Sequence, residues 1–301
     1  MNYDLITILG PTASGKTKLA AKLSFRFNGE IISADSRQVY KGMNIGTGKD
    51  YNDYFVNGEK VIYHLIDIIE PYEEFSLFLF KENFSKTFND IKKRNKLPFL
   101  VGGTGLYLSS VLQNYNLKKA NFDSDEYDFL KIQPHEDLKE QLIELNSNLH
   151  NATDLTEKER TIKAIIIEKT KTLSSTPASE ISSLNIGIKL SRDEIKSRIT
   201  KRLNERFEAG MIDEVKKLID SGMSYEKLNF FGLEYRYIGL HIRGEMNYND
   251  MFQKLNSAIH NFAKKQMTWF RKMEKEGVKI SWIDDQDYEA AVNIIKNELQ
   301  L

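Results

Sequence analysis

Short apolar runs alternate with amphipathic stretches along the first third of the chain. Between the runs, apolar residues recur at helical spacing over residues 18–27 and 76–93. Strands that alternate with helices in this way are typical of a parallel sheet covered by helices on both faces. The runs with the length and composition of buried strands are 5–9, 30–33 and 98–101, with 61–64 as a weaker candidate.

The pattern changes after residue 117. Residues 118–184 contain no convincing strand, and two stretches within them, 134–149 and 156–173, have helical spacing. We therefore expect an α/β core formed by residues 1–117 and 185–301, interrupted by an all-helical insertion domain at 118–184. The later part of the core is expected to hold strands at 185–190 and 278–282 and helices at 192–209, 211–221, 248–275 and 288–299.

Composition excludes several classes of protein. The chain has 301 residues, with 43 Lys and Arg balanced by 43 Asp and Glu. A net charge of zero argues against non-specific coating of nucleic acid, although it allows a local basic groove. The absence of cysteine excludes disulfides, thiolate zinc sites and a cysteine nucleophile. Because no apolar run approaches the ~20 residues of a membrane span and no signal peptide is evident, we expect a cytoplasmic protein.

The segment Gly10–Thr17 reads GPTASGKT and fits the pattern G-x-x-x-x-G-K-[ST], with a predicted strand before it and a predicted helix after it. Such a loop wraps backbone N–H groups around phosphate oxygens, and the helix N-terminus adds partial positive charge. Lys16 supplies a full charge, and the Thr17 hydroxyl is a candidate Mg²⁺ ligand. The motif predicts a P-loop-type sheet and a bound di- or triphosphate, without identifying ATP as the ligand. The expected phosphate-binding residues are Gly10, Thr12, Ala13, Ser14, Gly15, Lys16 and Thr17.

Further polar residues follow other predicted strands. Asp35 lies just after the strand at 30–33, where open α/β sheets place ligands, so it should lie near the phosphate loop. A carboxylate there could hold Mg²⁺ through water or act as a general base, and the alternative is a turn cap. Gly102–Gly105 is a second candidate anion nest or simply a tight turn. Asp67 is either a Walker-B-like acid or a structural strand end.

Six motifs in this order carry a resemblance to a known family. Together they are similar to the bacterial tRNA dimethylallyltransferases, also called tRNA isopentenyltransferases or the IPP transferase family. The resemblance extends from Leu5 to about Trp282, nearly the whole chain. The motifs are GPTASGKT, SADSRQVYKGMNIGTGK, HLIDIIEP, PFLVGGTGLYL, SRDEIKSRITKR and AKKQMTWFR.

The resemblance implies a reaction and a role for each site residue. The enzyme would transfer a dimethylallyl group from dimethylallyl diphosphate to N6 of A37, the adenosine 3′ of the anticodon in tRNA, and release pyrophosphate. Asp35 would be the general base on the N6 amine, a role that typically raises rates ~10²–10⁴-fold. Thr104 would hydrogen-bond near the departing pyrophosphate. Lys16, Thr17 and Mg²⁺ would neutralise the charge that grows on it.

Binding of tRNA by a monomer is the remaining expectation. Gln38 is a candidate for pairing with the adenine edge, as glutamine amides do. The predicted helix 248–275 carries a basic set, and Arg198, Arg202 and Arg206 lie at i, i+4 and i+8 on another helix. Both stripes could bind tRNA phosphates, or they could be solvated, salt-bridged surfaces. The residues expected to contact tRNA are Ser36, Gln38, Arg160, Lys264, Lys265 and Gln266. The basic set comprises Lys254, Lys264, Lys265, Arg271, Lys272 and Lys275.

Two features depart from the family. The insertion, which grips the anticodon arm in the family, has a net charge of −4 from nine basic and thirteen acidic residues. The family also aims an arginine at the pyrophosphate, and here either Phe231 or Asn229 occupies that position. The nearest arginines in sequence are Arg236 and Arg243, and we favour a slower enzyme or a narrower substrate role. The alternatives are an enzyme that prenylates free adenine nucleotides, a P-loop kinase, and a weakly active tRNA-binding paralogue.

Overall fold

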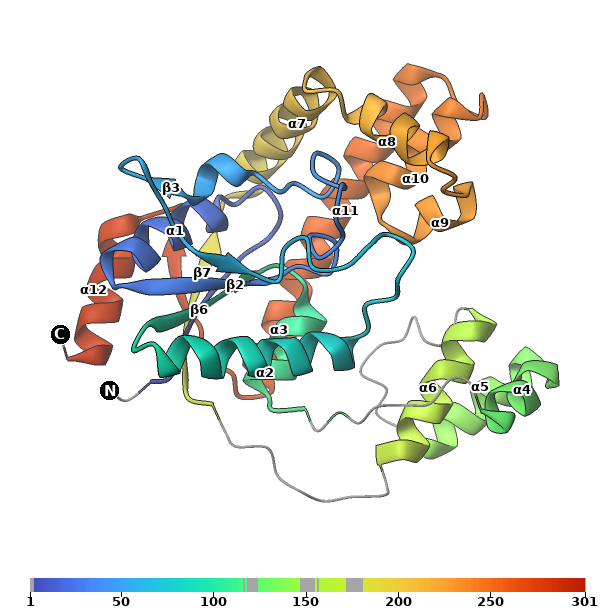
Figure 1. Ribbon diagram of the computed structural model, residues 1–301, viewed down its shortest axis with the longest axis horizontal. Helices are drawn as coiled ribbons and strands as arrows, with labels where there is room; N and C mark the ends of the chain where they lie inside the picture. The colour runs from blue at the N-terminus through green and yellow to red at the C-terminus, as the bar shows by residue number, and fades with distance from the viewer. Residues whose placement is uncertain are drawn as a thin grey trace. The chain divides into compact units, whose positions relative to one another are not determined.

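The computed structural model describes residues 3–115, 117, 124–146, 155, 157–171 and 181–300. Its contacts divide the chain into two compact units (Figure 1). The first unit comprises Met1–Gln113 with Ile181–Leu301, and the second comprises Asn114–Glu180. The expected insertion, 118–184, ends too late, because Ser183 and Leu184 already pair with Leu5 and Ile6 in the sheet of the first unit.

The first unit is built on a six-stranded sheet in which every neighbouring pair of strands is parallel. This confirms the predicted α/β class. The inner strands are buried along nearly their whole length, as expected when helices cover both faces of a sheet. The strand order is β5 (Tyr63–His64), β2 (Gly29–Ala34), β6 (Leu97–Gly102), β1 (Leu5–Leu9), β7 (Ser183–Lys189) and β8 (Ser281–Asp284).

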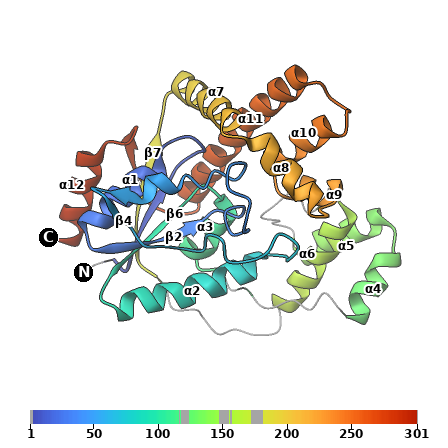
Figure 2. The ribbon, with the colours of Figure 1, turned by 45° about the horizontal axis from the view of Figure 1, so that its top comes forward.

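Successive residues of a strand point to opposite faces, and the two faces bury different helices. Ile6 and Ile8 pack with helices α1 (Lys16–Arg26) and α12 (Tyr288–Leu299). Leu5 and Leu9 belong to a separate apolar cluster on the other face. That cluster contains residues of α2 (Leu77–Lys93), α3 (Gly105–Leu112) and α11 (Tyr248–Lys275). The sheet is therefore the middle layer of three (Figure 2).

Further helices complete the first unit. Helices α7 (Arg192–Glu208) and α8 (Met211–Asp220) lie within a residue or two of their predicted bounds, and α7 begins with a Ser191–Glu194 capping box. Five further elements were not predicted from the sequence, and none of them is longer than ten residues. They are α9 (Tyr225–Phe230), α10 (Leu233–Ile242) and a segment of 3₁₀ helix at Tyr51–Tyr54 followed by the hairpin β3 (Phe55–Val56) and β4 (Glu59–Lys60).

The described part of the second unit is helical. Helices α5 (His135–Leu145) and α6 (Lys158–Lys171) match the two predicted helices, whose expected outer residues 147–149, 156 and 172–173 lie outside the described residues. Helix α4 (Asp125–Ile132) was not predicted. The three helices share a core of Leu130, Leu138, Leu142, Ile162, Ile165 and Ile166. Among the described residues, no helix is long and apolar enough to cross a membrane.

Candidate active site

Three adjacent strands bring the predicted site residues to one edge of the sheet. Leu9 of β1 and Ala34 of β2 both pair with Gly102 of β6, which lies between them. The next residue of each strand therefore opens a loop at the same edge, where parallel sheets bind ligands. A side chain at position 102 would place Cβ 2.2 Å from the Ala34 carbonyl oxygen, so the close approach requires glycine. The predicted meeting of these loops is confirmed.

The phosphate loop has the backbone of an anion nest. Ala13 and Gly15 have φ angles of +60° and +77°, in the left-handed region, and helix α1 begins directly afterwards. The first N–H that bonds within the helix is that of Leu19, to Gly15, so the N–H groups of the first helical turn are oriented toward a ligand. The Ser14 hydroxyl is buried and has no hydrogen-bond partner among the described residues.

Lys16 lies at the centre of the charges around this loop. Its Nζ donates to the Pro11 carbonyl at 3.3 Å. Burial lowers the pKa of Lys16 to about 8, the charge of Asp35 opposes this shift, and the charge of Arg202 adds to it. The lysine is thus close enough to Asp35 and Arg202 for their fields to act on it.

Asp35, Ser36 and Thr104 lie together beside the loop. The Ser36 N–H donates to Thr104 Oγ1 at 3.2 Å, which joins the loops that follow β2 and β6. Asp35 Oδ1 accepts the N–H of Arg37 at 2.9 Å. This bond makes Asp35 a turn cap, the alternative considered from sequence, and it also orients the carboxylate. The other carboxylate oxygen, Oδ2, is the candidate for a general base.

Gln266 is the clearest correction to the predicted tRNA contacts. Its side chain is buried, and its Oε1 accepts the N–H of Thr12 at 2.8 Å. Its Nε2 donates to the Gly103 carbonyl at 2.9 Å. Gln266 therefore ties the phosphate loop to the end of β6 and supports the site from behind. The sequence motif AKKQMTWFR correctly marked this segment as part of the site. Whether Gln266 faces the solvent or the phosphate loop is decided by how the helix packs.

Gln38 is also engaged within the protein. Its Oε1 accepts from the Ser33 hydroxyl at 3.1 Å, and its Nε2 donates to the Gly48 carbonyl at 3.0 Å. The predicted bidentate contact with adenine would require both bonds to break. In this conformation the amide holds the segment after β2 instead.

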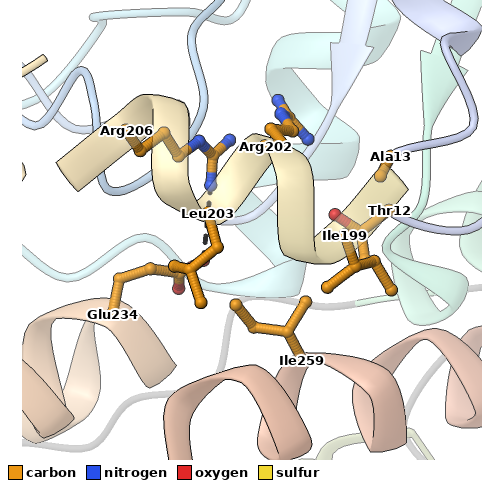
Figure 3. Close-up of a pocket in the computed structure, with 8 residues that line it drawn as sticks. All are labelled: Thr12, Ala13, Ile199, Arg202, Leu203, Arg206, Glu234 and Ile259. Atoms are coloured by element: carbon orange, nitrogen blue, oxygen red, sulfur yellow. Dashed lines mark hydrogen bonds and ion pairs between the residues drawn. The ribbon is translucent and has the colours of Figure 1, made fainter. Parts of the chain in front are cut away.

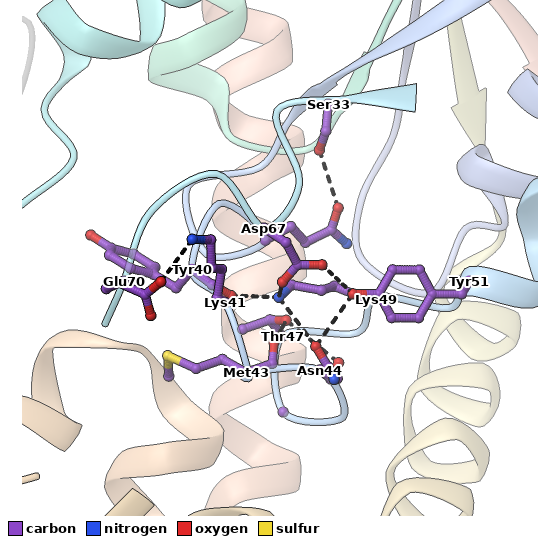
Figure 4. Close-up of polar contacts among 12 residues, drawn as sticks. Ser33, Tyr40, Lys41, Met43, Asn44, Thr47, Lys49, Tyr51, Asp67 and Glu70 are labelled. Carbon is purple, nitrogen blue, oxygen red and sulfur yellow. Dashed lines mark hydrogen bonds and ion pairs between the residues drawn. The ribbon is translucent and has the colours of Figure 1, made fainter. Parts of the chain in front are cut away.

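Asp67 holds the same segment and is not free for a metal. Its carboxylate accepts from the ammonium group of Lys49 and from the Tyr51 hydroxyl (Figure 4). The Lys49 side chain is fully buried, and Lys49 also donates to the Tyr40 carbonyl. A buried charge of this kind needs a partner, and Asp67 is that partner. The Walker-B-like interpretation of Asp67 is wrong, and Lys49 is a residue that sequence reasoning missed.

The arginine stripe on α7 faces acids of its own unit. Arg198 pairs with Asp285 at 2.7 Å, and Arg202 pairs with Asp50. Arg206 is largely buried, and its nearest partner is Glu234 at 3.4 Å. Arg202 and Arg206 line a pocket together with two residues of the phosphate loop, Thr12 and Ala13 (Figure 3). The spacing on the helix was predicted, but the interpretation of these arginines as a tRNA surface is not supported.

Phe231, which stands at the place of the missing arginine, is a core residue. Its ring packs edge-on against Tyr40 with a centroid distance of 4.9 Å, and its side chain is 1% exposed. The two nearest arginines in sequence are engaged elsewhere. Arg236 lies over the Tyr237 ring, and Arg243 pairs with Glu245 at 2.9 Å. The structure therefore places a buried aromatic ring at position 231 and engages both neighbouring arginines elsewhere.

The basic residues expected to meet tRNA have different surroundings. On α11, Lys264 and Lys265 are exposed, as are Lys254 and Arg271. In the second unit, Arg160 lies 3.8 Å from Glu157, and Lys163 and Lys169 also pair with acids. The exposed face of α11 is thus the stronger candidate for phosphate contacts.

The donor set at the sheet edge fits a magnesium ion held mainly by substrate. No cluster of three His, Asp or Glu side chains occurs within the described residues. Mg²⁺ usually takes few protein ligands in phosphate sites and completes its shell with phosphate oxygens and water. The Thr17 hydroxyl, at the start of α1, and Asp35, through water, are the groups that would hold it.

The fold and this edge define a P-loop protein that is shaped to bind a phosphorylated substrate next to a carboxylate. Models of two families match the chain: IPP transferase over residues 38–273 and isopentenyl transferase over residues 3–67. The chain belongs to the IPP transferase family, and it is accordingly an enzyme.

Individual relatives agree with this assignment. The chain is 46% identical to tRNA dimethylallyltransferase 1 of Syntrophus aciditrophicus over 304 residues, which cover 100% of each chain. It is 51% identical to tRNA dimethylallyltransferase 2 of Syntrophotalea carbinolica over 290 residues, 94% of this chain and 95% of the relative. The solved structure of the full-length tRNA isopentenylpyrophosphate transferase of Bacillus halodurans is 32% identical, with a TM-score of 0.70 and coverage of 99% and 97%.

Proposed function

We propose that this enzyme is a tRNA dimethylallyltransferase. It transfers the dimethylallyl group of dimethylallyl diphosphate to N6 of A37 in tRNA and releases pyrophosphate. The observation that carries the proposal is the alignment of Leu9, Gly102 and Ala34, which sets the phosphate loop, Thr104 and Asp35 at one edge of the sheet in a chain of this family.

The chemistry follows from these neighbours. The adenine N6 amine is a weak nucleophile, because its lone pair is delocalised into the ring. Asp35 Oδ2 would accept the N6 proton as the new C–N bond forms. The bond between the dimethylallyl carbon and the diphosphate oxygen breaks, and the leaving group keeps the electron pair. Lys16, the free N–H groups of the loop and the Thr104 hydroxyl then stabilise its negative charge.

Bound Mg²⁺ would supply further charge neutralisation on the diphosphate. The tRNA would approach along the exposed face of α11, where Lys264 and Lys265 can contact phosphates. Its target base has to leave the stack of the anticodon loop, which costs less than extruding a paired base. The monomeric state and the cytoplasmic location stay predictions.

Purified enzyme incubated with labelled dimethylallyl diphosphate tests the proposal directly. We expect label in tRNA at an adenosine next to the anticodon, and none in AMP. Label in AMP instead would favour the free-nucleotide enzyme, and ATP-dependent phosphoryl transfer without prenylation would favour a kinase. Binding of tRNA with turnover below one per enzyme would indicate the weakly active paralogue.

A further inference from the structure

Arg206 has surroundings that a salt bridge within the protein does not explain. Its side chain is only 13% exposed, and its Nη1 lies 3.4 Å from Glu234 Oε1. Charge-assisted pairs are usually ~2.7–2.9 Å long, so this contact is loose. Its Nε is buried, and no hydrogen-bond acceptor for it occurs in the described part of the chain. Buried guanidinium donors normally find partners, so an acceptor is missing here.

A second arginine converges on the same place. A Cβ at Gly48 would lie 1.8 Å from Arg206 Nη2 and 2.6 Å from Arg202 Nη2, so both guanidinium groups lie against this glycine. Two like charges so close together repel each other unless anionic groups offset them. Burial, together with the charge of Arg202, lowers the pKa of Arg206 to about 10. Burial also raises the pKa of Glu234, the acid that lies 3.4 Å from Arg206, and so disfavours its charged form.

The same two arginines line a pocket beside the phosphate loop. Its other lining residues are Thr12 and Ala13 of the loop, Glu234, and apolar side chains of α7 and α11 (Figure 3). The field of both arginines reaches Lys16 and opposes its protonation. Three cations therefore surround one loop, with two partly compensating acids, Asp50 and Glu234. A diphosphate carries the negative charge that this group lacks.

We propose that Arg206, assisted by Arg202, binds the diphosphate of the prenyl donor opposite Lys16 and neutralises its charge as it leaves. This rests on the proposed function and names the cation that Phe231 cannot provide. As the bond from the prenyl carbon to oxygen breaks, the electron pair passes to the diphosphate, and the guanidinium of Arg206 donates to its oxygens. The proton of N6 goes to Asp35. Arg206 then exchanges its loose contact with Glu234 for contacts with the ligand.

The experiment measures binding of inorganic diphosphate by calorimetry without tRNA, and single-turnover transfer separately. The key variant is Arg206→Gln/Glu234→Gln, which removes both charges and leaves no buried acid unpaired. We expect its affinity for inorganic diphosphate to fall about tenfold to hundredfold, as for loss of a charged hydrogen-bond donor. Its transfer rate at saturating dimethylallyl diphosphate should fall about 10²–10³-fold. Lys201→Gln removes an exposed charge from the same helix and should stay within about twofold of wild type.

Glu234→Gln alone separates ligand binding from a structural role. Because the acid competes with the ligand for Arg206, its removal should leave diphosphate affinity equal to that of wild type or higher. The proposal is overturned if Glu234→Gln loses as much affinity as Arg206→Gln. It is also overturned if Arg206→Gln/Glu234→Gln binds diphosphate within twofold of wild type while Lys16→Ala does not. If wild type binds diphosphate but transfers no prenyl group, the proposed function fails and the binding data still test Arg206.

Discussion

Helices α7 and α11 each carry several basic residues, but these side chains lie in opposite environments. On α7, Arg198 and Arg202 pair with acids, and Arg206 is buried beside Glu234. On α11, Lys264 and Lys265 are exposed, and the next residue, Gln266, is buried against the phosphate loop. One turn of α11 thus presents cations to solvent and an amide to the site.

The comparison shows that residue spacing predicts which side chains share one face of a helix. It does not predict which other segments pack against that face. Residues of α7 line a pocket together with the phosphate loop, and Asp50, Glu234 and Asp285 from three distant segments pair with its arginines. No comparable acids face Lys264 and Lys265 within the described residues. We infer that the buried groups beside the phosphate loop act on the diphosphate and the adenine. The exposed lysines of α11 would act on the tRNA backbone.

The largest expected effect is that of replacing Asp35, which lies beside the phosphate loop. Asp35→Asn keeps the size of the side chain and its contact with the Arg37 N–H, but it cannot take a proton. Prenyl transfer in a single turnover should fall about 10²–10⁴-fold, while tRNA affinity stays within twofold. Ser36→Ala, next to it, is the matched control and should lose much less. A loss below tenfold in Asp35→Asn would mean that another group removes the N6 proton.

Phe231→Arg should damage the fold and should not restore activity. Position 231 lies among Tyr40, Phe230 and Tyr235, so a guanidinium there would be buried among aromatic rings. Uncompensated burial of a charge costs several kcal/mol, about 3 or more in comparable cases. Urea unfolding measures the loss, and Tyr72→Arg, at a side chain that is 78% exposed, serves as the control. A stable variant with faster prenyl transfer would contradict this prediction and indicate that the wild-type enzyme lacks a cation for the diphosphate.

The titration of Lys16 gives a pH dependence with a definite sign. Its pKa of about 8 means that the free protein carries the charge below pH 8 and loses it above. Bound diphosphate favours the charged form, so binding above pH 8 takes up a proton and affinity falls by up to about tenfold per pH unit. Lys16→Arg stays charged throughout. The ratio of the wild-type and variant Kd values for dimethylallyl diphosphate cancels titration of the ligand, and it should bend near pH 8 rather than stay constant.

Gln266 and its neighbours compare the two faces of α11 directly. Gln266→Leu removes the bonds to Thr12 and Gly103 and should weaken diphosphate binding about tenfold, the cost of one or two buried hydrogen bonds. The salt dependence of tRNA binding by the Gln266→Leu variant should match that of the wild type. A change in that salt dependence with normal diphosphate affinity would return Gln266 to the tRNA surface.

The smallest effect is expected for the exposed lysines of α11. Replacing Lys264 and Lys265 by glutamine should lower the slope of log K against log[salt] for tRNA by about 0.7–0.9 for each phosphate that is no longer neutralised. Diphosphate affinity should not change, because both lysines are exposed to solvent. The matched variant Lys201→Gln, on the exposed side of α7, should leave the slope as it is. An unchanged slope in the lysine variant would place the tRNA on another surface.

The sequence by itself determined the parts of this protein that depend on local rules. The alternation of apolar runs and amphipathic stretches predicts the parallel sheet, and the glycines of residues 10–17 predict the phosphate loop. The meeting of Asp35 with that loop also follows, because the carboxyl ends of parallel strands share one edge. Only the tertiary structure decided which way Arg206, Gln266 and Asp67 point. Their partners lie 28, 254 and 18 residues away, and no periodicity along one element contains information about side chains on another.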